Sequence, residues 1–386
     1  MSSIREFAVR FGFLTAVAVA VSGCNSSKSA DAPKAGGGET NTEGLTASAE
    51  KGSEEAVKKP FVLGDLIDPF TPPPLEEIER TANWSESPVR DGLTLMREHQ
   101  KALGPPQLTP AEALSRQNDS NESNRLIRDA LGRVAPEDNA GVNFDAEIVL
   151  VAPVDLKTTN PFLASSVVDF DYSSHTGFGL FGFDWEMNPF GSKDAIVSWQ
   201  TSEDKLMDKV VLRDDLTWSD GRPITAHDVE YTFKAIMTDA VLVWALRDGT
   251  DQLRYVKAYD DHTVVFFHKE ALATNIWNMV FSIIPKHVFE SALPEDPAMA
   301  RSPAFTRLED KPVVGGPYTL SRRIRGQEFV LERREDYYMH NGQQVRDKPY
   351  FKTVRYKVIE DANTALLALK SGSVDAHELT AEQWTL

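Results

Sequence analysis

The chain has 386 residues, of which 41 are Lys or Arg and 58 are Asp or Glu, so its formal net charge at pH 7 is −17. This charge argues against nucleic-acid binding, which needs clustered positive charge, and against a polybasic contact with anionic lipid. There is one cysteine, which excludes an intrachain disulfide and a zinc cluster built on cysteines. The length is enough for more than one domain of ordinary size.

The N-terminus has the pattern of a secretory signal. Arg5 and Arg10 precede an apolar run over residues 11–21, and Ser22-Gly23-Cys24 follows it. The run has about 11 residues, too few for a membrane-spanning helix. The small residues before the cysteine resemble the bacterial lipobox, which implies that residues 1–24 are a lipoprotein signal and that Cys24 becomes a lipid anchor. The alternative is an uncleaved signal anchor with an incidental cysteine.

Two further segments precede the well-patterned part of the chain. Residues 25–59 are rich in Ser, Ala, Gly, Lys and Glu, which predicts a flexible linker. Residues 60–141 are interrupted by prolines, and we expect a partly helical, solvated spacer. Its two predicted helices are Leu75–Ala82 and one that starts at the capping box of Thr109. The alternative for this segment is a module that docks a partner.

From Ala146 onward, predicted strands and helices alternate. Helices are expected after Thr225 and after Asp361, because in each case a capping residue precedes an apolar-periodic run. The predicted strands are Glu147–Ala152, Lys209–Arg213, Val264–His268, Tyr318–Ile324, Glu328–Glu332 and Val354–Glu360. This interleaving indicates the α/β class.

The most informative stretch is Leu212–Phe233. Gly221 in the sequence Ser-Asp-Gly suits a tight turn that needs positive φ. Thr225 and Asp228 have the spacing of a capping box at the start of a helix. The helix is expected to bury a stripe formed by Val229, Phe233 and Ile236 or Met237.

This stretch closely resembles the signature of the family 5 extracellular solute-binding proteins, the oligopeptide- and dipeptide-binding receptors of ABC importers. Three other stretches of the chain also match the family, in the order in which the family has them, and together they extend the resemblance over about residues 146–386. They are Asn160-Pro161, Val313–Tyr318 with the hairpin after it, and Val358–Ala376. The family's Gly-Thr-Gly-Pro-Tyr is replaced here by Val314-Gly315-Gly316-Pro317-Tyr318.

The resemblance implies a two-lobed periplasmic-binding-protein type II fold. The first lobe, residues 146–313, would be largely present, and residues 314–386 would begin a second, incomplete lobe. The family runs on past Leu386, so we expect a chain truncated at its C-terminus. The acidic residue with which family receptors hold a peptide's ammonium group would lie in the missing part.

By the same resemblance, the protein is expected to be a lipid-anchored component of a peptide importer on the periplasmic side of a bacterial membrane. It would bind an oligopeptide or similar small solute between its lobes, deliver it to ABC permease subunits, and catalyse no reaction. No cofactor and no metal is expected. The alternative is an interaction lipoprotein that has lost the ligand clamp and no longer takes part in transport.

The resemblance also places candidate ligand contacts. The first-lobe segment that contacts peptide backbone in family receptors falls on Val167, Val168, Asp169 and Phe170. The alternative is that Val167 and Phe170 are ordinary core residues and that Asp169 is a solvated loop residue.

Other patterns carry less weight. The G-x-G-x-x-G pattern of Gly177–Gly182 lacks a following helix, so dinucleotide binding is not expected. His287 and Glu290 lie one helical turn apart, but they resemble a structural helix start in the family more than a metal site. We find no P-loop and no Gly-x-Ser-x-Gly nucleophile elbow.

Overall fold

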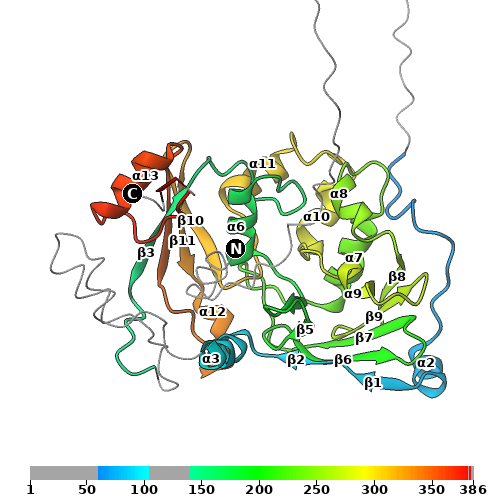
Figure 1. Cartoon of the computed structure of the whole chain (residues 1–386). Coiled ribbons are helices and arrows are strands. Elements are labelled where there is room, and N and C mark those ends of the chain that lie inside the picture. The colour runs from blue at the N-terminus through cyan, green and yellow to red at the C-terminus, as the bar shows by residue number, and fades with distance from the viewer. Residues whose placement is uncertain (1–59, 104–138, 381, 384–386) are drawn as a thin grey trace, which may run out of the picture.

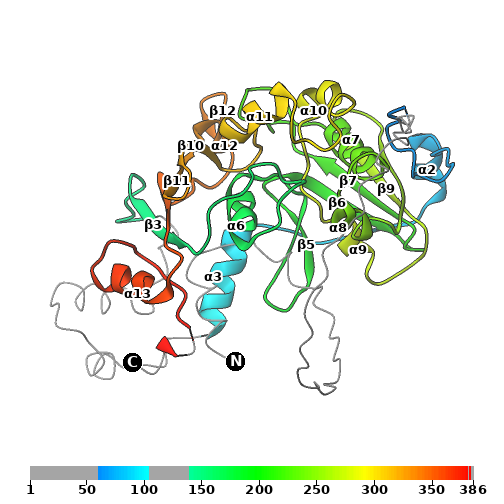
Figure 2. The same cartoon turned by 90° about the horizontal axis from the view of Figure 1, so that it is seen from above.

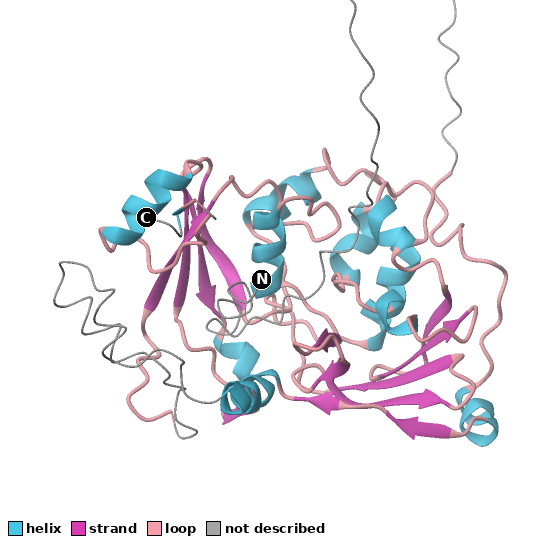
Figure 3. Ribbon diagram, viewed as in Figure 1, coloured by secondary structure: helices cyan, strands magenta, loops and turns pink. Residues whose placement is uncertain are grey.

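A computed structural model describes residues 60–103, 139–380 and 382–383. The predicted signal, lipobox and linker lie outside these residues, as does the helix predicted at Thr109. The described chain folds around two main β-sheets that stand apart from one another, each with helices packed against it (Figures 1 and 3). This mixed α/β architecture agrees with the class predicted from the sequence.

The larger sheet has five strands, all paired antiparallel. In spatial order they are β1 (Trp84–Glu86), β6 (Ile196–Ser202), β7 (Met207–Leu212), β9 (Thr263–His268) and β8 (Leu253–Ala258). The inner strand β9, between β7 and β8, has the sequence TVVFFH and is buried from Val264 to His268. Such a continuous run of β-branched and aromatic residues is typical of a strand that is covered on both faces.

One face of this sheet, the one that bears Val264 and Phe266 of β9, carries the largest core, and helix α7 (Ala226–Ile236) packs on it. The predicted capping box between Thr225 and Asp228 is present, and Val229, Phe233 and Ile236 are fully buried. Gly221 has φ +83°, as its turn requires. The other helices of this half are α8 (Trp244–Asp248), α9 (Asn275–Asn278), α10 (Lys286–Ala292) and α11 (Pro303–Asp310).

The second main sheet has four strands. Its order is β10 (Tyr318–Ile324), β11 (Glu328–Arg333), β14 (Thr353–Val358) and β3 (Glu147–Ala152). Strand β3 pairs parallel with β14, and Glu147 lies opposite Thr353. Helix α6 (Val167–Thr176) packs on this sheet through Val168 and Tyr172, and α13 (Ala362–Lys370) follows β14.

The parallel pairing of β3 bears on the predicted boundary between lobes. We assigned β3 to a lobe that ends at residue 313 and the strands after residue 314 to the next lobe. In the structure these strands share one sheet, so residue 313/314 does not separate two sheets. This pairing was not predicted, because the sequence signals of a strand do not indicate its partner, which here lies about 200 residues away.

Two small sheets complete the described fold. One joins β2 (Val89–Arg90), β5 (Pro189–Ser192) and β4 (Phe181–Phe183). The other is a short hairpin after α12 (Glu335–Tyr338), formed by β12 (Met339–His340) and β13 (Gln343–Gln344).

The two main sheets are joined by buried hydrogen bonds between motif residues. Ser219 N donates to Val314 O at 2.8 Å, and Gly316 N donates to Thr176 O at 2.9 Å. The guanidinium of Arg334, a buried residue, donates to Val314 O, Gly316 O and Thr217 O at 2.9–3.0 Å. A Cβ on Gly316 would lie 2.7 Å from Gly177 O, so only glycine fits this approach.

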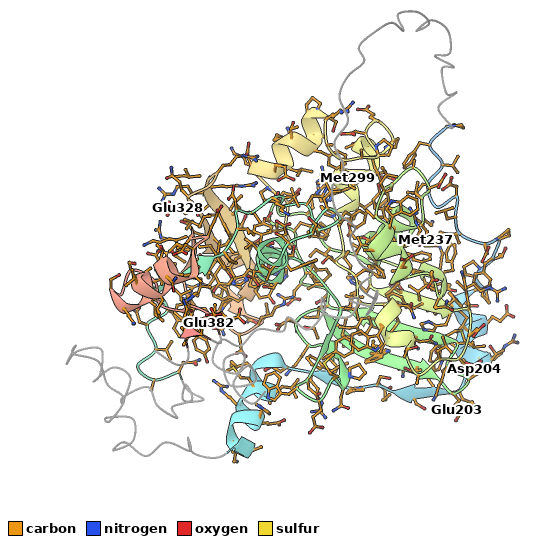
Figure 4. The ribbon with its side chains drawn as sticks, turned by 45° about the horizontal axis from the view of Figure 1, so that its top comes forward. Glu203, Asp204, Met237, Met299, Glu328 and Glu382 are labelled. Carbon is orange, nitrogen blue, oxygen red and sulfur yellow. The ribbon has the colours of Figure 1, made fainter. Side chains whose placement is uncertain are left out.

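The N-terminal described segment, residues 60–103, differs from the solvated spacer that we expected. It is partly helical, with α2 (Leu75–Thr81) and α3 (Gly92–Leu103), but it also supplies β1 and β2. Ile78 of α2 is 2% exposed and packs with Val265 and Phe267 on the face of the large sheet opposite to α7. Figure 4 shows Glu203 beside the N-terminal segment, where its carboxylate accepts a hydrogen bond from Asn83.

Helix α3 of the same segment lies between the two main sheets in both views (Figures 1 and 2). His99 makes an edge contact with the ring of Trp185 in the β4–β5 hairpin. Arg97 donates to Tyr350 Oη at 3.4 Å, in the loop before β14. Residues 60–103 therefore contact both halves of the structure.

We predict that Ile78→Ala lowers the free energy of unfolding by about 2–4 kcal/mol, because it leaves a cavity against Val265 and Phe267. The exposed residue Leu63 on the same segment provides the control, and Leu63→Ala should change the unfolding free energy by less than about 0.5 kcal/mol. Urea titrations followed by circular dichroism measure both. Equal midpoints for the two variants would show that the segment is a solvated spacer after all.

Candidate ligand-binding site

The four predicted contact residues form the first turn of α6. Ser166 caps the helix, and its side chain accepts a hydrogen bond from Asp169 N in a complete capping box. Val167 is 58% exposed and Phe170 is 39% exposed, so both present apolar surface to solvent. Val168 is fully buried in the core beneath the helix.

The carboxylate of Asp169 is fully buried, and four backbone amides donate to it. Oδ1 accepts from the amides of Lys157 and Thr158 at 2.9 and 3.4 Å, and Oδ2 accepts from Ser165 and Ser166 at 3.1 and 3.0 Å. Burial disfavours the charged carboxylate, but these hydrogen bonds outweigh burial and hold the pKa of Asp169 below its ordinary value. Asp169 therefore binds the loop before the helix.

Of the four predicted residues, the structure leaves two able to touch a solute with their side chains, namely Val167 and Phe170. The side chains of Val168 and Asp169 have no exposed surface. The alternative assignment was wrong in detail as well, because Val167 and Phe170 are not core residues and Asp169 is not solvated. A ligand contact through this turn remains a prediction.

The loop before α6 is also held by side chains that sequence reasoning did not identify. Glu309 of α11 accepts hydrogen bonds from Thr158 Oγ1 at 2.5 Å and from Thr159 N at 3.1 Å. Arg323 of β10 donates to the carbonyl oxygens of Leu156 and Lys157. Glu309 and Arg323 are about 150 residues further along the chain, and neither lies in a motif that points to this loop.

A small cavity lies beside the same loop, where three sequence motifs meet. Its volume is about 40 Å³, and its lining includes Asn160, Pro161, Trp218, Val314 and Gly315. Pockets that enclose a drug-sized ligand have roughly 300 Å³ or more, so this cavity is too small for a peptide. The motif residues around it serve the packing between the two halves of the fold.

The patterns that we set aside have structural partners. His287 Nε2 lies 2.7 Å from Asp220 Oδ2 and joins α10 to the Trp218 turn. Strand β4 begins within Gly177–Gly182, and no helix follows it, so the pattern has no dinucleotide-binding context.

Among the described residues, no three His, Cys, Asp or Glu side chains converge as metal ligands would. No helix within 60–103, 139–380 and 382–383 has the length and apolarity needed to cross a bilayer.

We predict that Asp169→Asn lowers the free energy of unfolding at pH 7 by about 2–3 kcal/mol, because an amide nitrogen replaces one acceptor among four donors. The pKa of Asp169 is depressed in the folded state, so the stability that its charge provides is complete above the ordinary pKa near 4. It is lost as the pH falls through the lower, folded-state value. The difference between wild type and variant should therefore shrink toward pH 2 in urea titrations.

The exposed carboxylate of Asp214 provides the control for this experiment, and Asp214→Asn should leave the midpoint within error at every pH. A deficit of Asp169→Asn that stays constant between pH 7 and pH 2 would contradict the role assigned to the charge.

Comparison with known proteins identifies relatives of this chain. Residues 193–386, half of the chain, match the model of "bacterial extracellular solute-binding proteins, family 5 Middle". The oligopeptide-binding protein AppA of Bacillus subtilis is 27% identical over 184 residues, which are 45% of this chain and 30% of AppA. The chain thus spans less than a third of that relative's length.

Solved structures show the same fold. The structure of AppA in complex with a nonapeptide superposes with a TM-score of 0.51 at 22% identity, covering 60% of this chain and 44% of that one. The periplasmic EDTA-binding protein EppA gives a TM-score of 0.53 at 21% identity, over 66% of this chain and 48% of its own. The described residues therefore have the α/β fold of two-lobed periplasmic binding proteins over the part that they cover. The match over residues 193–386 shows that the chain belongs to the family 5 bacterial extracellular solute-binding proteins.

Proposed function

We propose that this protein is the lipid-anchored, periplasmic substrate-binding component of an ABC-type peptide importer. The observation that carries the proposal is the match of half the chain to the family 5 solute-binding proteins. Its relatives include an oligopeptide-binding protein and a structure with a bound nonapeptide. The family consists of binding proteins rather than enzymes, and the proposed task of this chain is to bind a peptide or similar solute and deliver it to a permease, without chemistry.

The proposed binding mode follows from the position of the α6 turn. Val167 and Phe170 offer apolar surface at the start of a helix whose entry loop is fixed by the buried Asp169. An extended peptide would lie across this turn, and its main chain would provide most of the hydrogen bonds. Main-chain pairing is insensitive to side-chain identity, so one receptor accepts many sequences. A second lobe would close over the peptide by hinge motion.

The proposed organisation keeps residues 1–24 as the signal and 25–59 as the linker. Residues 60–103 become part of the binding unit rather than of a spacer, because they pack on the large sheet through Ile78 and supply β1. The division into lobes is proposed to follow the sheets rather than residue 313.

We predict that short peptides raise the thermal midpoint of the whole chain in a concentration-dependent manner, since a ligand that binds only the native state stabilises it. Thermal unfolding with a mixture of peptides of three to nine residues measures this effect. For a peptide that binds the wild-type protein, the double variant Val167→Ala with Phe170→Ala should have an affinity about tenfold weaker or more, because two apolar contacts are lost.

The exposed Val197 on β6 provides the matched control, and Val197→Ala should leave the affinity unchanged. Unchanged affinity in the double variant would exclude the α6 turn as the contact. A chain that no peptide stabilises would instead favour the alternative of an interaction lipoprotein that has lost its ligand clamp.

We predict that Cys24→Ser abolishes lipid attachment and leaves the uncleaved precursor, because serine has no thiol to carry the lipid. Labelling with radioactive palmitate in a bacterial host, followed by membrane fractionation, measures both effects. Ser26→Ala, two residues away, is the control and should be labelled normally. Label retained in Cys24→Ser would exclude the lipobox assignment.

A further inference from the structure

Two carboxylates from different parts of the fold hold the loop that enters α6. Asp169 belongs to the helix itself and binds the amides of Lys157 and Thr158. Glu309 belongs to α11 and binds the hydroxyl of Thr158 and the amide of Thr159. Consecutive backbone positions of the loop are therefore fixed from two sides.

A positively charged side chain, Arg323, holds the carbonyl oxygens of the same loop. Arg323 on β10 donates to the carbonyl oxygens of Leu156 and Lys157, and its guanidinium lies 3.4 Å from the carboxylate of Glu309. The side chain of Arg323 is 5% exposed and that of Glu309 is 24% exposed. Charge-assisted hydrogen bonds with so little solvent around them are stronger than those at a free surface.

Two further hydrogen bonds fix the ends of the loop. Thr159 Oγ1 donates to Leu308 O at 3.1 Å, and the carboxylate of Asp155 accepts from Gly326 N at 3.0 Å at the tip of the β10–β11 hairpin. The loop thus contacts α11, β10 and the hairpin tip, which all lie about 150 residues or more further along the chain.

We propose that Glu309 and Arg323 are positioning residues for ligand binding: they fix loop 155–159, and through it the α6 turn that carries Val167 and Phe170. The inference rests on the proposed function of that turn. Neither side chain touches the solute. Their effect is to hold the turn in its binding geometry before the solute arrives, so that binding requires no ordering of the loop.

The experiment compares four variants of the whole chain. Glu309→Ala and Arg323→Ala remove the two positioning groups, and Glu309→Gln keeps an acceptor oxygen without the charge. Asp310→Ala is the matched control, since Asp310 is the exposed neighbour of Glu309 on the same helix. Two quantities are measured, namely amide hydrogen exchange of residues 157–159 without ligand and the affinity for a peptide that binds the wild type.

We expect Glu309→Ala and Arg323→Ala each to raise the exchange rate of the loop amides about tenfold, since each removes hydrogen bonds to a buried, ordered backbone. We expect the same variants to weaken peptide binding at least about fivefold. Glu309→Gln should show smaller changes in both quantities, and Asp310→Ala should show neither.

The outcomes separate this inference from the function on which it rests. Faster exchange with unchanged peptide affinity would overturn the positioning role while leaving the peptide-binding function intact. Unchanged exchange would overturn the role of Glu309 and Arg323 in holding the loop. A wild-type chain that binds no peptide would overturn the proposed function itself, and the positioning role with it.

Discussion

The guanidinium of Arg334 is the interaction on which the arrangement of the two halves depends. It is a buried charge that donates to main-chain oxygens on both sides of the junction, Thr217 on one side and Val314 and Gly316 on the other. Removing this buried group leaves Thr217 O and Gly316 O without their donor, while Val314 O keeps the amide of Ser219, and the loss costs more than that of a surface ion pair. Gly316 adds a steric condition, because its backbone approach to Gly177 leaves no room for a Cβ. Charge and close packing together set the relative position of the sheets, and the entry loop of α6 depends on that position.

The candidate site follows from this arrangement. The exposed turn of α6 carries Val167 and Phe170, yet the groups that fix it are buried or half-buried and come from α11 and β10 as well as from α6. A binding surface built in this way separates contact from support. The proposed contact residues would be free to vary with the solute, while the supporting carboxylates and guanidinium satisfy backbone groups that every sequence has.

The sequence was sufficient where the determining signals are local. The capping box of Thr225 and Asp228, the buried stripe of α7 and the turn at Gly221 follow from residues a few positions apart, and all three are present. Pairing over long distances was not predictable. Nothing in Trp84–Glu86 indicates that it completes a sheet edge, because a three-residue strand has no periodicity to detect. The burial of Asp169 escaped prediction for a related reason: four backbone donors converge on it only after the loop has folded.

The parallel pairing of β3 with β14 also bears on how the chain reaches its native state. Strand β3 meets its partner only after about 200 further residues are available, whereas β6 and β7 are neighbours joined by a tight turn. Loop closure on that scale is slower than the local pairing of β6 with β7, so we expect β3 to stay unpaired until the chain through β14 is available. A polypeptide of this design can complete its four-stranded sheet only when the chain through Val358 is available.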